Sequence, residues 1–358
     1  MVEADWKRLE RTILKDRAVS PILATLILAA IVISAGLWLY AQISGMLYRQ
    51  YSRIEVQVVS LDLYKFEDKV LFMVSARNTG SKPLVGIIVS CMDDNGKRFS
   101  LALPPAEPGV TVNNSLIIPL GVSNIVLDGS GNNYHGTIYG AKWTEGKVGK
   151  ALSFDGKRDY VKVSGFYPNI GDNYKGSITA TFQVKPSSKA DGYVFIDGNK
   201  NEGYIKFEAK NKRVLYQFQS ASTQISLSEF SKWHFAALAT NGGSTYLKAF
   251  LDDYSKKVSQ GACTGWCGPD GDLYLGYKFA GVIDDIFFCK QVLLDEEVSW
   301  NRIHPNLPVT RGLVLWLPLN EGSNDPYVFT SGNSYPITVT AYSLDGDVYT
   351  RTISTVCA

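Results

Sequence analysis

Several kinds of catalytic and metal chemistry have little material in this sequence. Among its 358 residues there are only 3 histidines and 5 cysteines, and no cluster of them has the spacing of a zinc site. No Ser/His/Asp order, phosphate-binding glycine loop or closely spaced carboxylate pair of the glycosidase type stands out. The net charge is only +2, which gives no reason to expect a nucleic-acid partner. The sequence therefore predicts a protein that is not an enzyme.

Charged residues are also absent from the whole run between Ala18 and Tyr48. As a helix this run would extend about 46 Å, whereas roughly 20 residues suffice to cross a bilayer core. It is apolar on all sides, which suits lipid or a fully buried helix. Basic residues before it hold the N-terminus in the cytoplasm under the positive-inside rule, so we expect a single-pass membrane protein with extracellular C-terminal domains. They are Lys7, Arg8, Arg11, Lys15 and Arg17.

The segment Arg17-Ala-Val-Ser-Pro21, just before the apolar helix, resembles the class III signal peptide of archaeal type IV prepilins and archaellins. The resemblance implies that a prepilin peptidase cuts between Ala18 and Val19. It also implies a leader over 1–18 and an apolar helix over 19–52. This helix would sit in membrane lipid before assembly and then pack with copies of itself or other pilins in a filament core. The alternative is a plain signal anchor that is never cleaved.

The chain after the helix favours β structure, because aromatic residues make up 12% of the sequence and apolar residues alternate with polar ones. Such alternation lies around 54–58, 70–76, 85–91 and 337–341. Residues 53–120 and 328–358 together supply about six strands, which predicts a split immunoglobulin-like β-sandwich. The phrases Ala76–Pro83 and Ser331–Ala341 resemble the head domain of archaeal pilin-type proteins.

Residues 121–327 carry an ordered series of motifs that resembles the concanavalin A-like, laminin-G-like jelly roll. The series comprises Asp128–Gly140, Gly149–Gly156, Asp159–Val163, Trp233–Leu238, Leu273–Gly276, Phe279–Phe287 and Leu294–Val298. The resemblance implies a jelly roll inserted into the split sandwich. Family members usually open with a strand like Gly312–Gly322, which comes last here and implies a circular permutation. The competing interpretation takes Ile117–Leu120 as the opening strand.

Two cysteine pairs are candidates for disulfides if this part is extracellular. Cys91 and Cys357 lie in opposite pieces of the split sandwich, and we predict a disulfide that locks it, contributing about 3–5 kcal/mol. The alternative is two unpaired buried thiols. Cys263 and Cys267 could close a tight loop, with an ordinary hairpin turn as the alternative. Asn113 begins a glycosylation sequon.

The jelly-roll resemblance also implies two kinds of binding residue. A structural Ca²⁺ would take oxygen ligands, and the matching donors are Asp128, Asn132, Asp284 and Asp285. Ordinary turn chemistry is the alternative for these residues. Sugar-binding sandwiches use exposed aromatic rings, for which Tyr134, Trp143 and Trp266 are the first candidates, followed by Tyr193, Tyr204 and Tyr216.

The sequence thus predicts a mainly β protein with a long N-terminal helix. We expect a pilin-like surface filament subunit that displays a glycan- or surface-binding jelly roll for adhesion. The alternative is a monomeric, membrane-anchored extracellular lectin or adhesin that does not polymerise.

Overall fold

The structure is a computed structural model whose chain divides into two compact units at Arg53 and Ile54. It describes residues 21–51, 53–166, 177–198, 203–218, 221–241, 246–259 and 271–358. Several predicted residues lie outside these ranges, so their predictions stay as they were. They are Arg17, Ala18, Val19, Cys263, Trp266 and Cys267.

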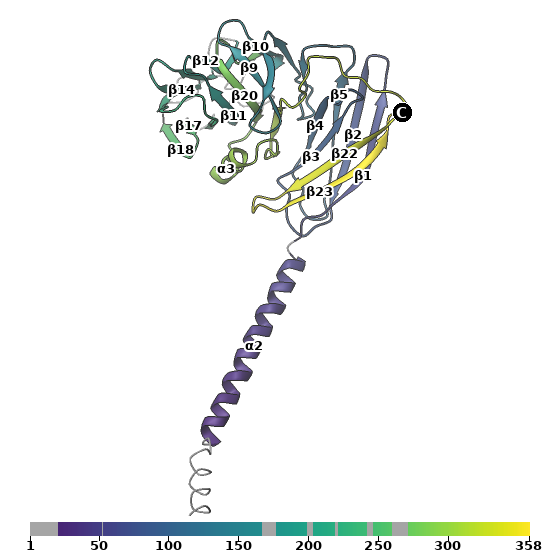
Figure 1. The fold of residues 1–358 in the computed structure, drawn as a ribbon, viewed down its shortest axis with the longest axis vertical. Coiled ribbons are helices and arrows are strands. Elements are labelled where there is room, and N and C mark those ends of the chain that lie inside the picture. The colour runs from purple at the N-terminus through teal and green to yellow at the C-terminus, as the bar shows by residue number, and fades with distance from the viewer. Residues whose placement is uncertain are drawn as a thin grey trace, which may run out of the picture. The chain divides into compact units, whose positions relative to one another are not determined.

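The first unit contains the helix α2 (Pro21–Tyr51), drawn in purple in Figure 1. Proline at its first position loses no helical hydrogen bond, because the N–H groups of the first turn have no intrahelical partner. The span Thr25–Ile43 has a mean hydropathy of 2.1, and its side chains, such as Leu28 and Trp38, are exposed within this unit. By length and composition this helix could cross a membrane, either as an anchor or as a signal sequence.

The second unit, Ile54–Ala358, is built from antiparallel sheets, which confirms the mainly β prediction. Two small sheets form a first sandwich. Its strands come from the beginning and the end of this unit, and Figure 1 shows them side by side. One sheet has the order β1 (Val56–Lys65), β2 (Lys69–Asn78), β5 (Thr111–Pro119). The other has the order β23 (Val348–Val356), β22 (Ser334–Tyr342), β3 (Gly86–Met92), β4 (Arg98–Leu103). We call this the host sandwich.

The host sandwich is completed by the C-terminal strands, because β22 pairs with β3 over six residues, from Ile337 opposite Cys91 to Tyr342 opposite Gly86. Its alternating inward residues meet in one apolar core, where the ring of Phe99 makes edge contacts with Phe72 and Phe329. The two sequence segments are therefore mutually dependent, since neither sheet can bury its apolar face alone.

The segment between them forms two eight-stranded sheets packed on a large apolar core. The first, which we call the open sheet, has the order β15 (Ala221–Ser226), β14 (Arg213–Phe218), β13 (Gly203–Glu208), β12 (Asp191–Asp197), β19 (Gly271–Leu275), β10 (Tyr160–Phe166), β7 (Gly136–Tyr139), β6 (Ile125–Val126). The second, which we call the covered sheet, has the order β18 (Tyr254–Ser259), β17 (Tyr246–Leu251), β16 (His234–Asn241), β11 (Ser177–Pro186), β20 (Ala280–Cys289), β9 (Lys150–Asp155), β8 (Lys142–Glu145), with β21 (Leu313–Leu317) beside β20.

The position of β21 decides between the two predicted opening strands. This strand pairs antiparallel with β20 inside the covered sheet, although it comes last in the inserted segment. Ile117 and Ile118 instead belong to β5, which pairs with β2 of the host sandwich. The interpretation of Ile117–Leu120 as the opening strand of the jelly roll is therefore wrong.

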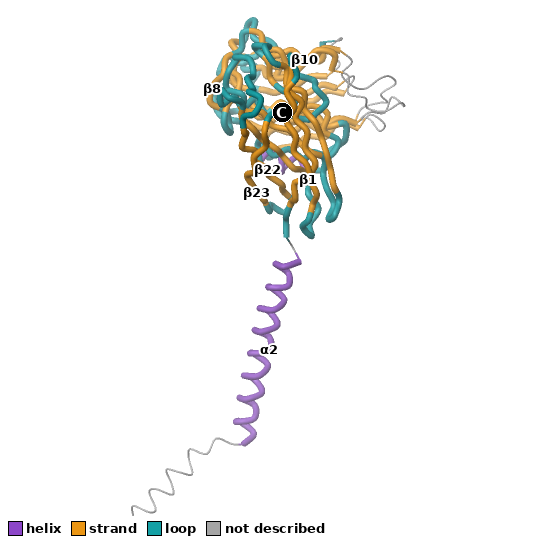
Figure 2. Tube along the Cα trace, turned by 90° about the vertical axis from the view of Figure 1, so that its right-hand side faces the viewer, coloured by secondary structure: helices purple, strands orange, loops and turns teal. Residues whose placement is uncertain are grey.

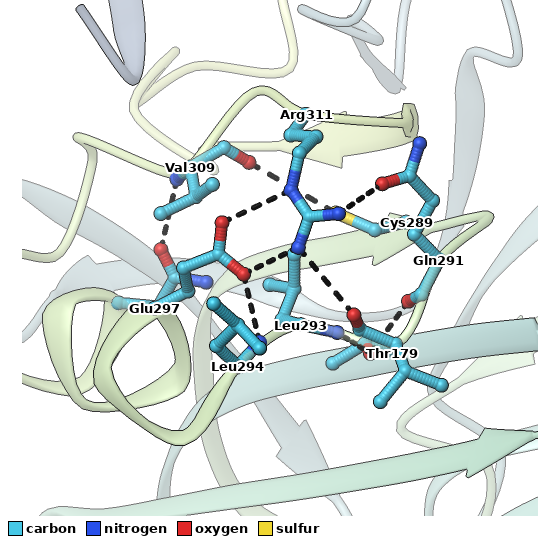
Figure 3. Close-up of polar contacts among 10 residues, drawn as sticks. Thr179, Cys289, Gln291, Leu293, Leu294, Glu297, Val309 and Arg311 are labelled. Atoms are coloured by element: carbon cyan, nitrogen blue, oxygen red, sulfur yellow. Dashed lines mark hydrogen bonds and ion pairs between the residues drawn. The ribbon is translucent and has the colours of Figure 1, made fainter. Parts of the chain in front are cut away.

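The short helix α3 (Asp295–Ile303) and the segment that follows it pack on the covered sheet. Figure 3 shows the contacts that fix its first turn. Glu297 accepts a hydrogen bond from the backbone N–H of Leu294 (2.7 Å) and pairs with the guanidinium of Arg311. Arg311 also contacts Gln291, and Thr179 of β11 accepts from the backbone N–H of Leu293 (3.0 Å). These contacts hold α3 against β11 and β20.

A separate apolar cluster joins the host sandwich to the jelly roll. The ring of Trp300 on α3 stacks on Tyr342 of β22, with centroids 5.5 Å apart and planes at 7°. The Tyr342 hydroxyl donates to the carbonyl of Pro308 (2.5 Å), and the backbone N–H of Thr310 donates to Val85 (3.0 Å). Figure 2 shows the strands of both parts gathered in one β-rich body.

The predicted disulfide between Cys91 and Cys357 is wrong, since both residues are buried free thiols, as is Cys289. The strand register explains the difference. Cys91 lies opposite Ile337 of β22. The backbone N–H of Cys357 instead donates to the carbonyl of Asn333, which is four residues before Ile337. Four residues of strand span about 13 Å. A disulfide needs Cα atoms within about 7 Å.

Candidate functional site

The predicted calcium donor Asp128 is fully buried and serves its own turn. Its Oδ1 accepts from the backbone N–H of Ser130 (2.9 Å) and of Trp316 (3.0 Å), and its Oδ2 accepts from the N–H of Tyr134 (3.0 Å). The Ser130 hydroxyl donates to the same carboxylate (2.8 Å). Asp128 therefore ties the turn after β6 to β21, which is the turn chemistry that the sequence left open.

The other predicted donors face different partners. Asp285 accepts from the indole N–H of Trp316 (2.9 Å) and the backbone N–H of Asn306 (3.0 Å). Asp284 accepts from the backbone N–H of Lys147 (2.8 Å), and Asn132 donates its side-chain amide to a backbone carbonyl. In the part of the chain that the structure describes, no three His, Cys, Asp or Glu side chains are placed to hold a metal ion. Calcium binding stays a prediction, but these four residues do not fit one shared site.

The first candidate aromatics pack against the jelly-roll core. Tyr134 is half-buried and meets the edge of Phe166, with ring centroids 5.2 Å apart. Trp143 is half-buried and donates its indole N–H to Asn324 (2.8 Å). Tyr216 is fully buried, and its hydroxyl donates to a backbone carbonyl. None of these three residues offers a freely exposed ring.

The side chain of Asn113, in β5, is exposed on the host sandwich. This position meets the surface condition that the sequon requires. Glycosylation of Asn113 stays a prediction.

A different aromatic surface covers the outer face of the open sheet. In β10, Val161 and Val163 enter the core, so the side chains that alternate with them, Tyr160 and Lys162, point outward. The same alternation brings out tyrosines on four further segments of this sheet. The rings of this tyrosine face are Tyr139 (β7), Tyr160 (β10), Tyr193 (β12), Tyr204 (β13), Tyr274 (β19) and Tyr277 (the turn after β19).

The rings of the tyrosine face form one connected series. Tyr160 lies directly opposite Tyr139 in the register, and these two rings are stacked with centroids 4.6 Å apart. Tyr160 also lies 5.7 Å from Tyr274 and 6.3 Å from Tyr277. Tyr193 continues the series, 6.5 Å from Tyr277. Tyr204 ends it, 5.4 Å from Tyr193. Spacings of 4.5–7 Å are those at which aromatic rings attract one another.

A tight turn brings Tyr277 onto this face. Gly276 has a φ of +73°, which a residue with a side chain adopts only with strain. Gly192 lies so close to this turn that a Cβ there would come within 2.1 Å of the Lys278 carbonyl oxygen. The backbone N–H of Tyr193 then donates to the carbonyl of Tyr277 (2.9 Å). The two glycines thus let the turn after β19 pack against β12, which places Tyr277 beside Tyr193.

Lysines lie among the rings. Lys162 pairs with Asp272 (2.7 Å) and lies 5.9 Å from the ring centre of Tyr274. Its hydrogen bond raises the pKa of Lys162 and lowers the pKa of Asp272. Lys206 pairs with Glu208 (2.9 Å) and lies over Tyr193. The tyrosine face therefore combines apolar rings with paired charges that can still donate and accept hydrogen bonds.

Sequence reasoning found only part of this surface. Tyr193 and Tyr204 were among its candidates, whereas Tyr139, Tyr160 and Tyr274 were not. All three of these other tyrosines stand inside sequence motifs of the jelly-roll series, namely Asp128–Gly140, Asp159–Val163 and Leu273–Gly276. A signal was present, because Tyr160 and Tyr274 each flank core valines or leucines at the strand period of two.

No protein-family model matches this sequence, and a comparison with curated protein sequences finds no match. Solved structures that are similar include domain 4 of AbnA, an extracellular arabinanase from Geobacillus stearothermophilus, in complex with arabinotriose. It is 16% identical, covers 50% of this chain and 98% of its own, and has a TM-score of 0.37. A SAP-like pentraxin from Limulus polyphemus is 14% identical over 51% of this chain and 85% of its own, with a TM-score of 0.32. A sialidase from Trypanosoma rangeli is 12% identical over 68% and 52%, with a TM-score of 0.36. At these scores and identities the likenesses say nothing about what this chain binds.

Proposed function

We propose that this chain is a surface-displayed binding protein whose tyrosine face docks glycans. The observation that carries the proposal is the connected series of partly exposed rings from Tyr139 to Tyr204, because the rings lie side by side on one sheet face. The apolar C–H face of a sugar ring stacks on an aromatic ring, and its hydroxyls hydrogen-bond to polar neighbours such as Lys162 and Asp272. Tyrosine suits this task because it supplies a large, rigid and amphipathic contact surface at low entropic cost.

A glycan array on the purified full-length chain tests this proposal. We expect binding to be lost in the double variant Tyr160→Ala/Tyr274→Ala, because both central rings of the series are removed. Tyr254→Ala is the matched control, since this tyrosine is 58% exposed but lies on β18 of the covered sheet. Equal glycan binding by the double variant and the wild type would refute the assignment.

We further propose that the chain is a pilin-like filament subunit whose function is adhesion. The support is the long helix α2, which carries no charged residue from Pro21 to Tyr48, together with the leader-like segment ending at Ala18. A helix that is apolar on all sides gains from burial in lipid and equally from burial among copies of itself. The chain would therefore reside in the cell membrane before assembly and at the cell surface afterwards.

The alternative function is a monomeric anchored lectin, which the same helix also supports. Mass spectrometry of the native N-terminus shows whether the leader over residues 1–18 is removed. A chain beginning at Val19 favours the pilin-like subunit, and a chain retaining Met1 favours the anchor. Electron microscopy then decides whether filaments form. We expect Ile31→Asp to abolish filaments, because a carboxylate at the centre of an apolar helix is costly to bury. Normal filaments from this variant would rule out a helical core.

A further inference from the structure

A pocket of about 640 Å³ lies where the chain passes between the host sandwich and the jelly roll. Its walls come from three places, namely the β3–β4 turn, the β8–β9 turn and the segment that returns to the host sandwich after β21. The polar residues of these walls include Lys97, Arg98, Lys150, Asn320 and Glu321. The volume falls in the range of small-molecule sites.

Lys97 forms one wall and is held in place by its surroundings. Its ammonium donates to the backbone carbonyl of Asp325 (2.6 Å) and lies 4.2 Å from the ring centre of Tyr327. Lys97 is only 3% exposed, and the charges of Glu321, Asp93 and Asp325 act on its ammonium, although none of these carboxylates forms an ion pair with it among the described residues. Burial lowers the pKa of Lys97 even though these three carboxylates oppose it, so an anion bound directly to the ammonium would stabilise its charged form further.

Glu321 forms a second wall and is 5% exposed. Its Oε1 accepts from the backbone N–H of Leu127 (2.9 Å), whereas its Oε2 has no hydrogen-bond partner among the described residues. Burial raises the pKa of Glu321 to about 7. Near neutral pH a large share of these side chains is therefore protonated and able to donate a hydrogen bond from Oε2.

The rim adds positive charge and amide groups. Arg98 and Lys150 are exposed there, and the Lys150 ammonium reaches out to Glu145. The carboxylate of Asp325 accepts from the Ser323 hydroxyl (2.5 Å), so it is already engaged. Near neutral pH the cationic side chains of the pocket thus outnumber its free carboxylates.

We propose that this pocket binds a uronic acid, that is, a sugar unit carrying a carboxylate. The carboxylate would lie beside Lys97 and Arg98, and the hydroxyls would meet Glu321 and the amide of Asn320. A sugar acid fits better than a simple anion because the pocket offers both donors and acceptors and has room for a ring. A metal cation fits poorly, since the Lys97 ammonium stands in the wall. This site is independent of the tyrosine face.

The test uses the full-length chain in a detergent whose head group is not a sugar. Binding of glucuronate and galacturonate is measured by calorimetry, with glucose, galactose and inorganic phosphate as comparison ligands. We expect a uronate to bind, and the neutral sugars and phosphate to bind at least about tenfold more weakly. The neutral sugars lack the carboxylate, and phosphate lacks the sugar ring with its hydroxyls. Equal binding of phosphate, or no uronate binding at millimolar concentration, would overturn the proposal.

Two substitutions locate the site. Lys97→Met removes the ammonium that lies over Tyr327 but keeps an unbranched apolar side chain, and it should weaken uronate binding at least about tenfold. Arg98→Gln changes an exposed side chain on the rim and should weaken uronate binding several-fold. Lys157→Met is the matched control, since this exposed lysine lies outside the pocket. Unchanged affinity in both Lys97→Met and Arg98→Gln would exclude this pocket as the site.

A pH series adds a readout that a purely structural role would not give. Glu321→Gln keeps the acceptor for Leu127 and a permanent donor, so it should retain uronate binding. The wild type should bind more weakly as the pH rises from 6 to 8, whereas Glu321→Gln should not. The charged or titratable groups around Glu321 are Asp93, Lys97, Arg98, Lys150, Asp325 and Tyr327. The same pH dependence in both proteins would contradict the role of Glu321.

The double variant Tyr160→Ala/Tyr274→Ala distinguishes the pocket proposal from the tyrosine-face proposal. This variant should bind uronate with wild-type affinity while losing glycan-array binding. Loss of uronate binding in this variant would instead show that the acid binds on the tyrosine face, and would refute the pocket.

Discussion

The open sheet and the covered sheet of the jelly roll follow the same alternation but carry different side chains on their outer faces. The covered sheet turns apolar residues such as Phe235 and Phe287 outward, where α3 and the host sandwich bury them. The open sheet turns out tyrosines and lysines, which remain half-exposed. The composition of an outward face therefore indicates whether the chain itself covers it. The proposed binding role of the tyrosine face fits this composition, because tyrosine is enriched at protein interfaces.

The largest expected effect lies on the covered side. Trp300→Ala removes a ring that is 4% exposed, stacks on Tyr342 and donates its indole N–H to Leu307 (2.8 Å). We expect a loss of about 3–5 kcal/mol in the free energy of unfolding. Chemical denaturation measures it, and Tyr160→Ala on the open sheet is the control, with an expected loss of about 1 kcal/mol or less. Equal losses of unfolding free energy in the two variants would contradict the difference between the covered and the open sheet.

The two sheets also differ in how they treat an aspartate. Asp272 on the open sheet pairs with Lys162, and its pKa is lowered. Asp284 on the covered sheet is fully buried, and burial followed by the charge of Asp285 raises its pKa to about 8. Between about pH 4 and pH 8 the unfolded state has released this proton while the folded state retains it, so stability falls as the pH rises.

The second prediction is that Asp284→Asn stabilises the protein at pH 8.5 and does so less at pH 4.5. Asparagine can still accept from Lys147 and carries no charge at either pH. Thermal unfolding of the variant and the wild type at both pH values measures the difference. Asp272→Asn is the control on the open sheet, where we expect a small destabilisation instead. A variant less stable than the wild type at pH 8.5 would contradict the burial argument.

The smallest expected effect concerns the stacked pair Tyr139 and Tyr160 on the open sheet. A double-mutant cycle to alanine should give a coupling of about 0.5–1 kcal/mol, because cross-strand aromatic pairs contribute roughly this much. Unfolding of the two single variants and the double variant supplies the cycle. A coupling several times larger would show that the face is a structural cluster and not an adaptable surface.

Much of the fold was predictable from local patterns. The apolar helix, the strand alternation at Val85–Cys91 and the displacement of Gly312–Gly322 to the end of the insert are features that the sequence carries directly. The disulfide was not predictable, because two cysteines in adjacent pieces say nothing about register. Their separation depends on Ile337, and not Asn333, lying opposite Cys91.

The candidate site was harder to predict for a physical reason. Asp128 and Asp285 are typical of oxygen-rich metal sites, yet the chain uses them to bind backbone and indole N–H groups. Exposure of an aromatic ring depends on which sheet face is left uncovered, and this follows from tertiary packing. Tyr216 and Tyr204 therefore look equivalent in sequence, although one is fully buried and the other half-exposed.

The most direct measurement of the central claim is an NMR titration of the chain with selectively labelled tyrosine rings, using a glycan that binds on the array. We predict that resonances of Tyr160, Tyr193 and Tyr274 shift together, while that of Tyr254 stays in place. Shifts confined to Tyr254 or Tyr134, with the tyrosine face unmoved, would contradict the account.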